Sequence, residues 1–168
     1  MEEKPIRVLG LDPGTRIAGY GILDIAPGRP PSLVTCGAFR LTAESIPDRL
    51  SVLYRDLRKL IGEYEPSVLA VETVFHGKSF QSVLKVGEAR GVVLLSGSLH
   101  GLEIHEFSPT MVKKVATGNG NAAKIQVQRM IARLLGLAKA PQPADVTDAL
   151  AIAFCYAQHS WRQKLPQR

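Results

Sequence analysis

The sequence predicts an α/β domain built around a central sheet. Three apolar, branched segments precede a long amphipathic helix pattern, and strand and helix patterns then alternate before a helical C-terminal third. The chain has 168 residues, of which 45% are hydrophobic. That length is typical of one domain and is sufficient to bury a core without disulfides.

The N-terminal elements are three strands and a helix. Ile6–Asp12 is apolar and ends at a Pro-Gly pair, Arg16–Ile25 resumes the apolar character after a turn, and Leu33–Leu41 forms the third strand. Apolar residues then recur every three or four positions over Ile46–Ile61, which predicts a half-buried helix that Pro66 stops.

The middle of the chain predicts a strand, a helix and a second strand. Val68–Glu72 is short and branched, as in a buried strand, and Glu103–Phe107 is a short edge strand. Between them, Phe80–Leu99 is a long helix pattern that contains three small residues, Gly87, Gly91 and Gly97. A glycine inside a helix costs about 1 kcal/mol relative to alanine, so these residues indicate close packing against the sheet or against a second copy of the chain.

The C-terminal third predicts three helices, Pro109–Thr117, Ala122–Leu135 and Ala144–His159. The side chains expected to face inward from the second of these helices are Ile125, Met130, Ile131, Leu134 and Leu135. Residues 1–160 are therefore expected to form one domain, and the basic tail 161–168 is expected to be disordered.

The composition favours a polyanionic partner in a reducing compartment. The formal charge is +6, which suits nucleic acid. Cys36 and Cys155 lie far apart without metal-ligand spacing and are expected to be reduced thiols. Residues 1–5 do not resemble a signal peptide, and no apolar run is long enough to span a bilayer. We therefore expect a cytoplasmic protein with no membrane contact.

Two acidic residues end predicted strands. Asp12 lies at the carboxyl end of the first strand, and Glu72 ends the apolar run Val68–Glu72. Functional sites of open α/β sheets lie at such strand ends. If the two strands are neighbours, the carboxylates lie about 5 Å apart across one strand spacing.

Two further acids begin the last predicted helix. Asp145 and Asp148 are three residues apart, a spacing that places them on one helix face. Asp145 alone is better explained as an acid that caps the helix and complements its dipole. If all four acids converge, their repulsion requires a cation, and Mg²⁺ or Mn²⁺ is the preferred partner of carboxylate oxygens. Two such ions about 3.5–4 Å apart can activate a water and stabilise the leaving oxygen of a phosphodiester.

Basic and aromatic loop residues form a candidate nucleic-acid interface. Lys113 and Lys114 precede a glycine-rich loop, and Lys124 follows it, so loop amides and ammonium groups together favour phosphate. Phe75, near Lys78, follows the strand that ends at Glu72, where an aromatic ring can stack on an unpaired base. Ordinary surface lysines and an aromatic lid over the sheet are the alternatives from the residues alone.

Several segments, in order, resemble the RuvC family of Holliday-junction resolvases, which belong to the ribonuclease-H-like superfamily. They cover nearly the whole chain: Leu9–Thr15, Val71–Phe75, Gly87–Gly91, Pro109–Lys113, Lys124–Val127 and Ala144–Ala151. The chain departs from the family pattern at Thr73, where glutamine is common, and at Asp145, where some relatives carry histidine.

The resemblance implies a five-stranded mixed sheet flanked by helices, and a homodimer that nicks four-way DNA junctions symmetrically, leaving 5′-phosphate and 3′-hydroxyl ends. It implies that Phe75 approaches the crossover bases and that Lys113 and Lys124 approach phosphates. It also implies cooperation with the RuvA–RuvB branch-migration complex. The residues implied to hold two Mg²⁺ or Mn²⁺ ions are Asp12, Glu72, Asp145 and Asp148.

Three other functions are weighed against junction resolution. A ribonuclease H acting on RNA–DNA hybrid would use the same acids, so only a comparison of substrates separates it. An actin-like ATPase would explain Asp12–Thr15 as a phosphate loop, but that fold normally needs two such domains. A non-catalytic junction-binding module would not need the complete set of acids.

Overall fold

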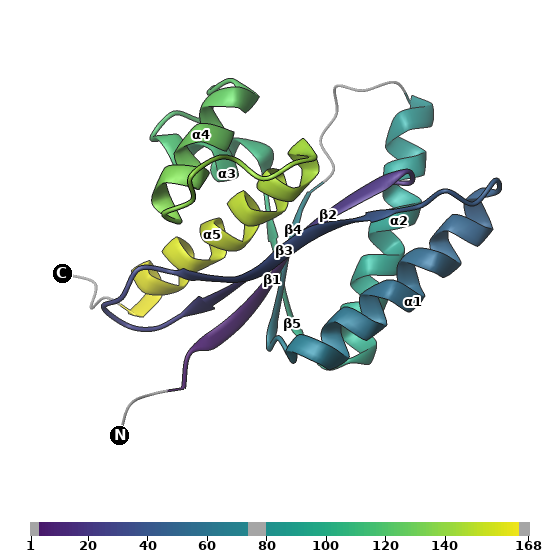
Figure 1. Ribbon diagram of the computed structural model, residues 1–168, viewed down its shortest axis with the longest axis horizontal. Helices are drawn as coiled ribbons and strands as arrows, with labels where there is room; N and C mark the ends of the chain where they lie inside the picture. The colour runs from purple at the N-terminus through teal and green to yellow at the C-terminus, as the bar shows by residue number, and fades with distance from the viewer. Residues whose placement is uncertain (1–3, 74–79, 165–168) are drawn as a thin grey trace.

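A five-stranded mixed sheet forms the centre of the computed structural model, which describes residues 4–73 and 80–164 (Figure 1). The strand order is β3-β2-β1-β4-β5, with β1, β2 and β3 antiparallel and β1, β4 and β5 parallel. This confirms the predicted α/β class. The strands are β1 (Ile6–Asp12), β2 (Ile17–Ile25), β3 (Ser32–Arg40), β4 (Val68–Glu72) and β5 (Glu103–Phe107).

Helices cover both faces of the sheet (Figure 1). One hydrophobic cluster joins the sheet to α1 and α2, and the other joins its opposite face to α3, α4 and α5. Within the described residues, none of the helices has the combination of length and apolar character that a membrane span requires. The helices are α1 (Ile46–Tyr64), α2 (Phe80–Leu99), α3 (Pro109–Thr117), α4 (Lys124–Leu134) and α5 (Ala144–Lys164).

The parallel pairing of β1 with β4 aligns their carboxyl ends. Gly10 pairs with Ala70 and Leu11 pairs with Val71, so Asp12 and Glu72 are the next residues on adjacent strands. Side chains alternate between the two faces of a strand. Ala70 packs in the cluster that contains α5, whereas Leu11 and Val71 pack toward α1 and α2. The alternation therefore assigns Asp12 and Glu72 to the α5 face.

Glycines in β1 and β2 let α5 lie directly against the sheet. A Cβ on Gly10 would lie 2.2 Å from the Ala149 carbonyl oxygen, and one on Gly19 would lie 2.0 Å from the Asp145 carbonyl oxygen. Both distances are far below van der Waals contact. The helix that carries two of the predicted acids is thus packed backbone against backbone on the strand end that carries Asp12.

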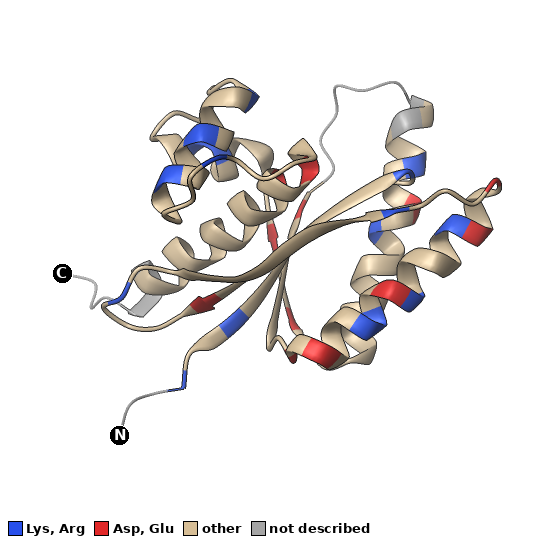
Figure 2. Ribbon diagram, in the orientation of Figure 1, with Lys and Arg blue, Asp and Glu red and all other residues tan. Residues whose placement is uncertain are grey.

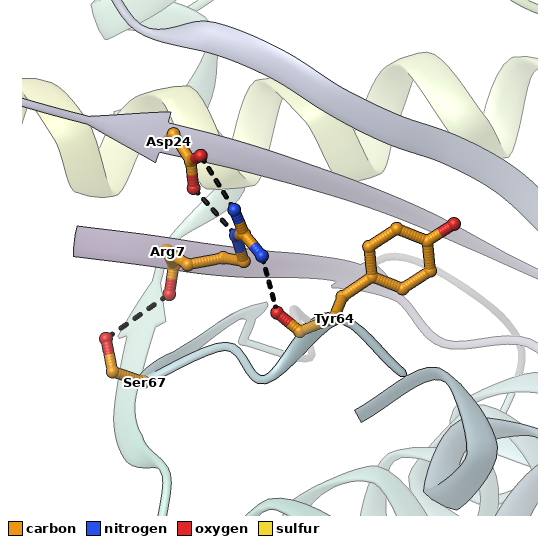
Figure 3. Close-up of polar contacts among 4 residues, drawn as sticks. All are labelled: Arg7, Asp24, Tyr64 and Ser67. Atoms are coloured by element: carbon orange, nitrogen blue, oxygen red, sulfur yellow. Dashed lines mark hydrogen bonds and ion pairs between the residues drawn. The ribbon is translucent and has the colours of Figure 1, made fainter. Parts of the chain in front are cut away.

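Arg7 braces the opposite end of β1 (Figure 3). Its guanidinium donates two hydrogen bonds of 2.8 and 2.9 Å to the Asp24 carboxylate on β2, and a third of 2.8 Å to the Tyr64 carbonyl at the end of α1. The Ser67 hydroxyl donates to the Arg7 carbonyl at 3.4 Å. This pairing raises the pKa of the Arg7 guanidinium. The network ties two strands, one helix and the start of β4 together, away from the predicted site.

Two predictions about the C-terminal helices are wrong. The helix predicted over Ala122–Leu135 spans Lys124–Leu134, and its residues Ile125 and Leu134 are 53% and 39% exposed because α4 packs through other residues. The last helix continues past His159 to Lys164, since the partly buried Trp161 packs against the core. Residues 161–164 are therefore helical, and 165–168 lie outside the described residues.

The three small residues of α2 have different surroundings. A Cβ on Gly97 would lie 2.5 Å from the Leu69 side chain, so this glycine permits close packing of α2 on the sheet, as predicted. Gly87 and Gly91 have nothing within 4 Å of such a Cβ. They face open space in a single copy of the chain.

Candidate active site

Asp12 lies at the carboxyl end of β1, where α5 crosses the sheet. Burial is the main cause that raises its pKa from the ordinary value of 3.8 to about 7. The negative charges of Asp148, Glu72 and Asp145 raise the pKa further, in that order, whereas Lys124 lowers it. All three other predicted acids therefore act on Asp12 electrostatically, although they come from distant parts of the sequence.

Glu72 is the last residue of β4, and neighbouring elements hold the backbone around it. The Arg90 guanidinium on α2 donates to the Glu72 carbonyl oxygen at 3.4 Å and forms an ion pair with Glu106 on β5. The Thr73 amide donates to the Phe107 carbonyl at 2.9 Å. The strand end that carries this carboxylate is thus anchored from one helix and one neighbouring strand.

Asp145 and Asp148 lie in the first turn and a half of α5. The two residues between them are buried, and the Thr147 hydroxyl donates to the Pro141 carbonyl at 3.0 Å, which fixes the start of the helix. Gly19, which contacts the Asp145 backbone, is also the sheet partner of Asp12. The sheet register therefore brings the start of α5 to the strand end of Asp12.

Lys124, the first residue of α4, supplies a positive charge to this cluster. Its ammonium lies 2.5 Å from Oδ2 of Asp148. Burial raises the pKa of Asp148, and the hydrogen bond from Lys124 partly opposes that increase. Burial lowers the pKa of the Lys124 ammonium, but the bond to Asp148 and the nearby acids outweigh this effect and raise it overall. Lys124 is therefore a charged partner of an acid as well as a predicted phosphate ligand.

The donor set fits a hard divalent cation by its chemistry. Four carboxylates contribute to the electrostatics at Asp12, and that much negative charge favours an oxygen-coordinated ion. Over residues 4–73 and 80–164, no group of three or more Asp, Glu, His or Cys side chains is already arranged to hold one ion. In this structure the cation next to Asp148 is the Lys124 ammonium. Ligation by these acids stays a prediction.

Three of the five predicted DNA-binding residues lie within the described part of the chain. Lys113 is half-buried on α3, Lys114 is exposed beside it, and Lys124 lies at the acidic cluster. Phe75 and Lys78 lie outside the described residues. The lysines therefore lie on the α3–α4 side of the sheet, the side that α5 and its two acids share.

Arg90 is a residue whose role the sequence analysis missed. It belongs to a segment that resembles the family pattern, yet its contacts with Glu72 and Glu106 depend on the packing of α2 across two strand ends. The available signal was an arginine within a helix pattern whose other residues are largely apolar or small, and the structure shows it half-buried. A cation that is partly withdrawn from water normally has an anionic or carbonyl partner.

The family model described as "Crossover junction endodeoxyribonuclease RuvC" matches residues 8–156. Among curated relatives, a protein of that name from Pelotomaculum thermopropionicum is 44% identical over 161 residues, covering 94% of this chain and 97% of the relative. Its namesake from Methylococcus capsulatus is 44% identical over 153 residues and covers 91% of each chain.

Solved structures agree with this match. The RuvC protein of T. thermophilus, in complex with a Holliday junction substrate, superposes with a TM-score of 0.87 at 29% identity, covering 94% of this chain and 96% of the other. The yeast mitochondrial Holliday junction resolvase superposes with a TM-score of 0.69 at 14% identity, which supports the fold alone.

Proposed function

The chain belongs to the RuvC family of crossover junction endodeoxyribonucleases, and from that premise we propose that it resolves four-way DNA junctions by hydrolysing phosphodiesters. The observation that carries the proposal is that Asp12 and Glu72 end adjacent parallel strands, against the start of α5, which carries Asp145 and Asp148. The charges of these three acids accordingly raise the pKa of Asp12. The neighbour solved with a Holliday junction supports the same substrate.

The four acids would hold Mg²⁺ or Mn²⁺, two ions per site. When bound, such ions supply an activated water and neutralise charge on the departing oxygen. The chain itself contributes a buried carboxylate at Asp12, a backbone-anchored carboxylate at Glu72, and two acids on α5 held by its close packing. When a metal ion is bound to Asp148, the Lys124 ammonium would be released from its ion pair with this acid and could bind a backbone phosphate instead.

The test is cleavage of a synthetic mobile four-way junction by the full chain in Mg²⁺ or Mn²⁺. Linear duplex and RNA–DNA hybrid of matched length are offered in parallel, and products are mapped to the nucleotide. We expect paired symmetric nicks in the junction only, with 5′-phosphate ends, and no nicks with Asp12→Asn. Preferential cleavage of the hybrid would identify a ribonuclease H instead, and an intact junction would refute the proposal.

We also propose that α2 pairs with its counterpart in a second copy, because symmetric nicks need two equivalent sites. Leu84, Gly87, Gly91 and Leu95 recur at three- and four-residue spacings and so occupy one helix face. Leu84 and Leu95 are 52% and 55% exposed, and both glycines adjoin open space. An apolar helix face without a cover is a favoured interface.

Light scattering tests the dimer. We expect a dimeric mass for the natural chain and a monomeric mass for Leu95→Lys, with Ile125→Lys as a control that changes an equally exposed side chain on α4. A monomeric natural chain would contradict the proposal.

The same family membership leads to two further predictions. The protein should act in the cytoplasm, where chromosomal DNA is the substrate, and it should contact the RuvA–RuvB complex. Co-sedimentation with RuvA on a junction tests the contact.

A further inference from the structure

The formal net positive charge of this protein is confined to one lobe. Residues 108–143, which comprise α3, α4 and the segments around them, contain six lysines and arginines and no aspartate or glutamate. Six equals the formal net charge of the whole chain, so the remainder of the protein is neutral. Figure 2 shows this lobe with blue segments and no red ones, next to the acidic start of α5.

A groove of about 380 Å³ lies in this lobe, between α4 and the loop that connects it to α3. Arg129 and Arg133 line it from α4, one helical turn apart, and both are exposed. Residues four apart on a helix lie on the same face. Within the described part of the chain, neither guanidinium forms a hydrogen bond or an ion pair.

The remaining polar lining also favours an anion. The Asn119 amide oxygen accepts from the Asn121 amide at 2.9 Å, and the Gln126 amide oxygen accepts from the Ala123 amide at 2.8 Å. Both side chains line the groove, so their NH₂ groups are the ones left to donate. Among the described residues, no carboxylate lines the groove. Donors and positive charge without a competing acid are the chemistry of a phosphate site.

The position of the groove identifies the source of the phosphate. Arg129 and Arg133 follow Lys124 by five and nine residues on the same helix, or about 8 and 14 Å along its axis. Lys124 itself contacts the carboxylate cluster through its ion pair with Asp148. At 3.6 residues per turn, however, the two arginines lie on the side of α4 away from Lys124. They would therefore hold phosphates other than the one beside the carboxylates, as a duplex arm that continues past this lobe would present.

We infer that the groove lined by Arg129 and Arg133 is a second phosphate-binding site, which holds the backbone of one junction arm outside the carboxylate cluster. This rests on the proposed junction-cleaving function and adds a contact that the cluster does not need. The contact is not specific to sequence, because only backbone phosphates are bound. It strengthens binding without changing which bond is cut.

The test measures junction affinity over a range of salt concentrations in Ca²⁺ or EDTA, and cleavage at saturating protein in Mg²⁺. The variant is Arg129→Ala/Arg133→Ala. The matched control is Arg55→Ala/Arg58→Ala, which removes the same charge from exposed positions on α1, across the sheet. We expect the groove variant to bind roughly tenfold more weakly and the slope of log K against log salt to shrink by about 2, at roughly 0.9 per phosphate contact.

The control variant should show the same slope of log K against log salt as the natural chain. Arg129→Lys/Arg133→Lys, which keeps both positive charges, should also retain most of that slope. Cleavage at saturation should match the natural chain, because the carboxylates are intact. If the natural chain binds and cuts junctions but the groove variant is indistinguishable from the control, the inference is wrong and the proposed function stands. If the natural chain neither binds nor cuts a junction, both fall.

Discussion

The ammonium of Lys124 lies 2.5 Å from Oδ2 of Asp148, so the first residue of α4 supplies positive charge to the carboxylates on α5. The Asp148 side chain is only 23% exposed, whereas that of Lys124 is 59% exposed. A largely buried acid thus depends on a cation that reaches in from the surface.

Lys124→Ala should lower the free energy of unfolding by about 1 kcal/mol in EDTA, because it leaves the Asp148 carboxylate without its partner and the lysine is mostly exposed. Millimolar Mg²⁺ should remove most of that deficit, since a bound cation replaces the ammonium. Thermal and urea unfolding with and without Mg²⁺ measure both effects. A deficit that Mg²⁺ leaves unchanged would contradict this relation between lysine and metal.

Asp12→Asn should stabilise the metal-free protein in a pH-dependent manner. The pKa of Asp12 rises from 3.8 to about 7 on folding, so its favourable contribution is complete below about pH 4 and is lost as the pH rises through 7. The variant should therefore exceed the natural chain in stability above pH 7, by at most about 4 kcal/mol, and match it near pH 4. Unfolding in EDTA at several pH values measures this difference in stability. Junction cleavage by the variant should be abolished. A stability difference that grows toward low pH would contradict the raised pKa of Asp12.

Gly19→Ala should destabilise the protein and impair cleavage, because a Cβ at this position would lie 2.0 Å from the Asp145 carbonyl oxygen. Overpacking of this kind costs about 1–3 kcal/mol and would push the start of α5 away from Asp12. Gly62→Ala in α1, where nothing lies within 4 Å, is the control and should gain up to about 1 kcal/mol. Circular dichroism melts and single-turnover cleavage distinguish the two.

Arg90→Gln should raise the metal concentration needed for half-maximal cleavage several-fold while junction binding in EDTA stays normal, because the guanidinium holds the backbone of Glu72. Arg7→Gln is a close match, since Arg7 also joins one carboxylate and one backbone carbonyl, but at the other end of β1. Each variant should lose about 1 kcal/mol of stability. Only the Arg90 variant should change the metal dependence, and Arg90→Lys should partly rescue it; equal behaviour of the two glutamine variants would show a purely structural role.

The sequence predicted the elements best where strong apolar patterns met clear stop signals. The strand Val68–Glu72 and the helix Phe80–Leu99 have the predicted bounds. The strand-end positions of Asp12 and Glu72 followed from the same patterns, because a strand's last residue is visible in its apolar run. Their adjacency required the pairing of β1 with β4, which local patterns leave open.

What the sequence could not predict depended on how the helices pack together. Ile125 and Leu134 have helical spacing, yet α4 contacts the core through Val127 and Ile131, and periodicity alone does not orient a short helix. The extension of α5 similarly depends on a core contact of Trp161. The pairing of Lys124 with Asp148 needs the whole α3–α4 lobe to be seated beside α5.

The absence of side chains at Gly10 and Gly19 has a consequence for how this enzyme tolerates evolutionary change. Where helix and strand meet backbone to backbone, the spacing between their carboxylates is set by the thickness of the peptide chain itself. Exchanges among the aliphatic residues of the surrounding core can alter stability without moving those carboxylates relative to one another. Divergent relatives can therefore retain the same reactive geometry, provided that both positions remain glycine.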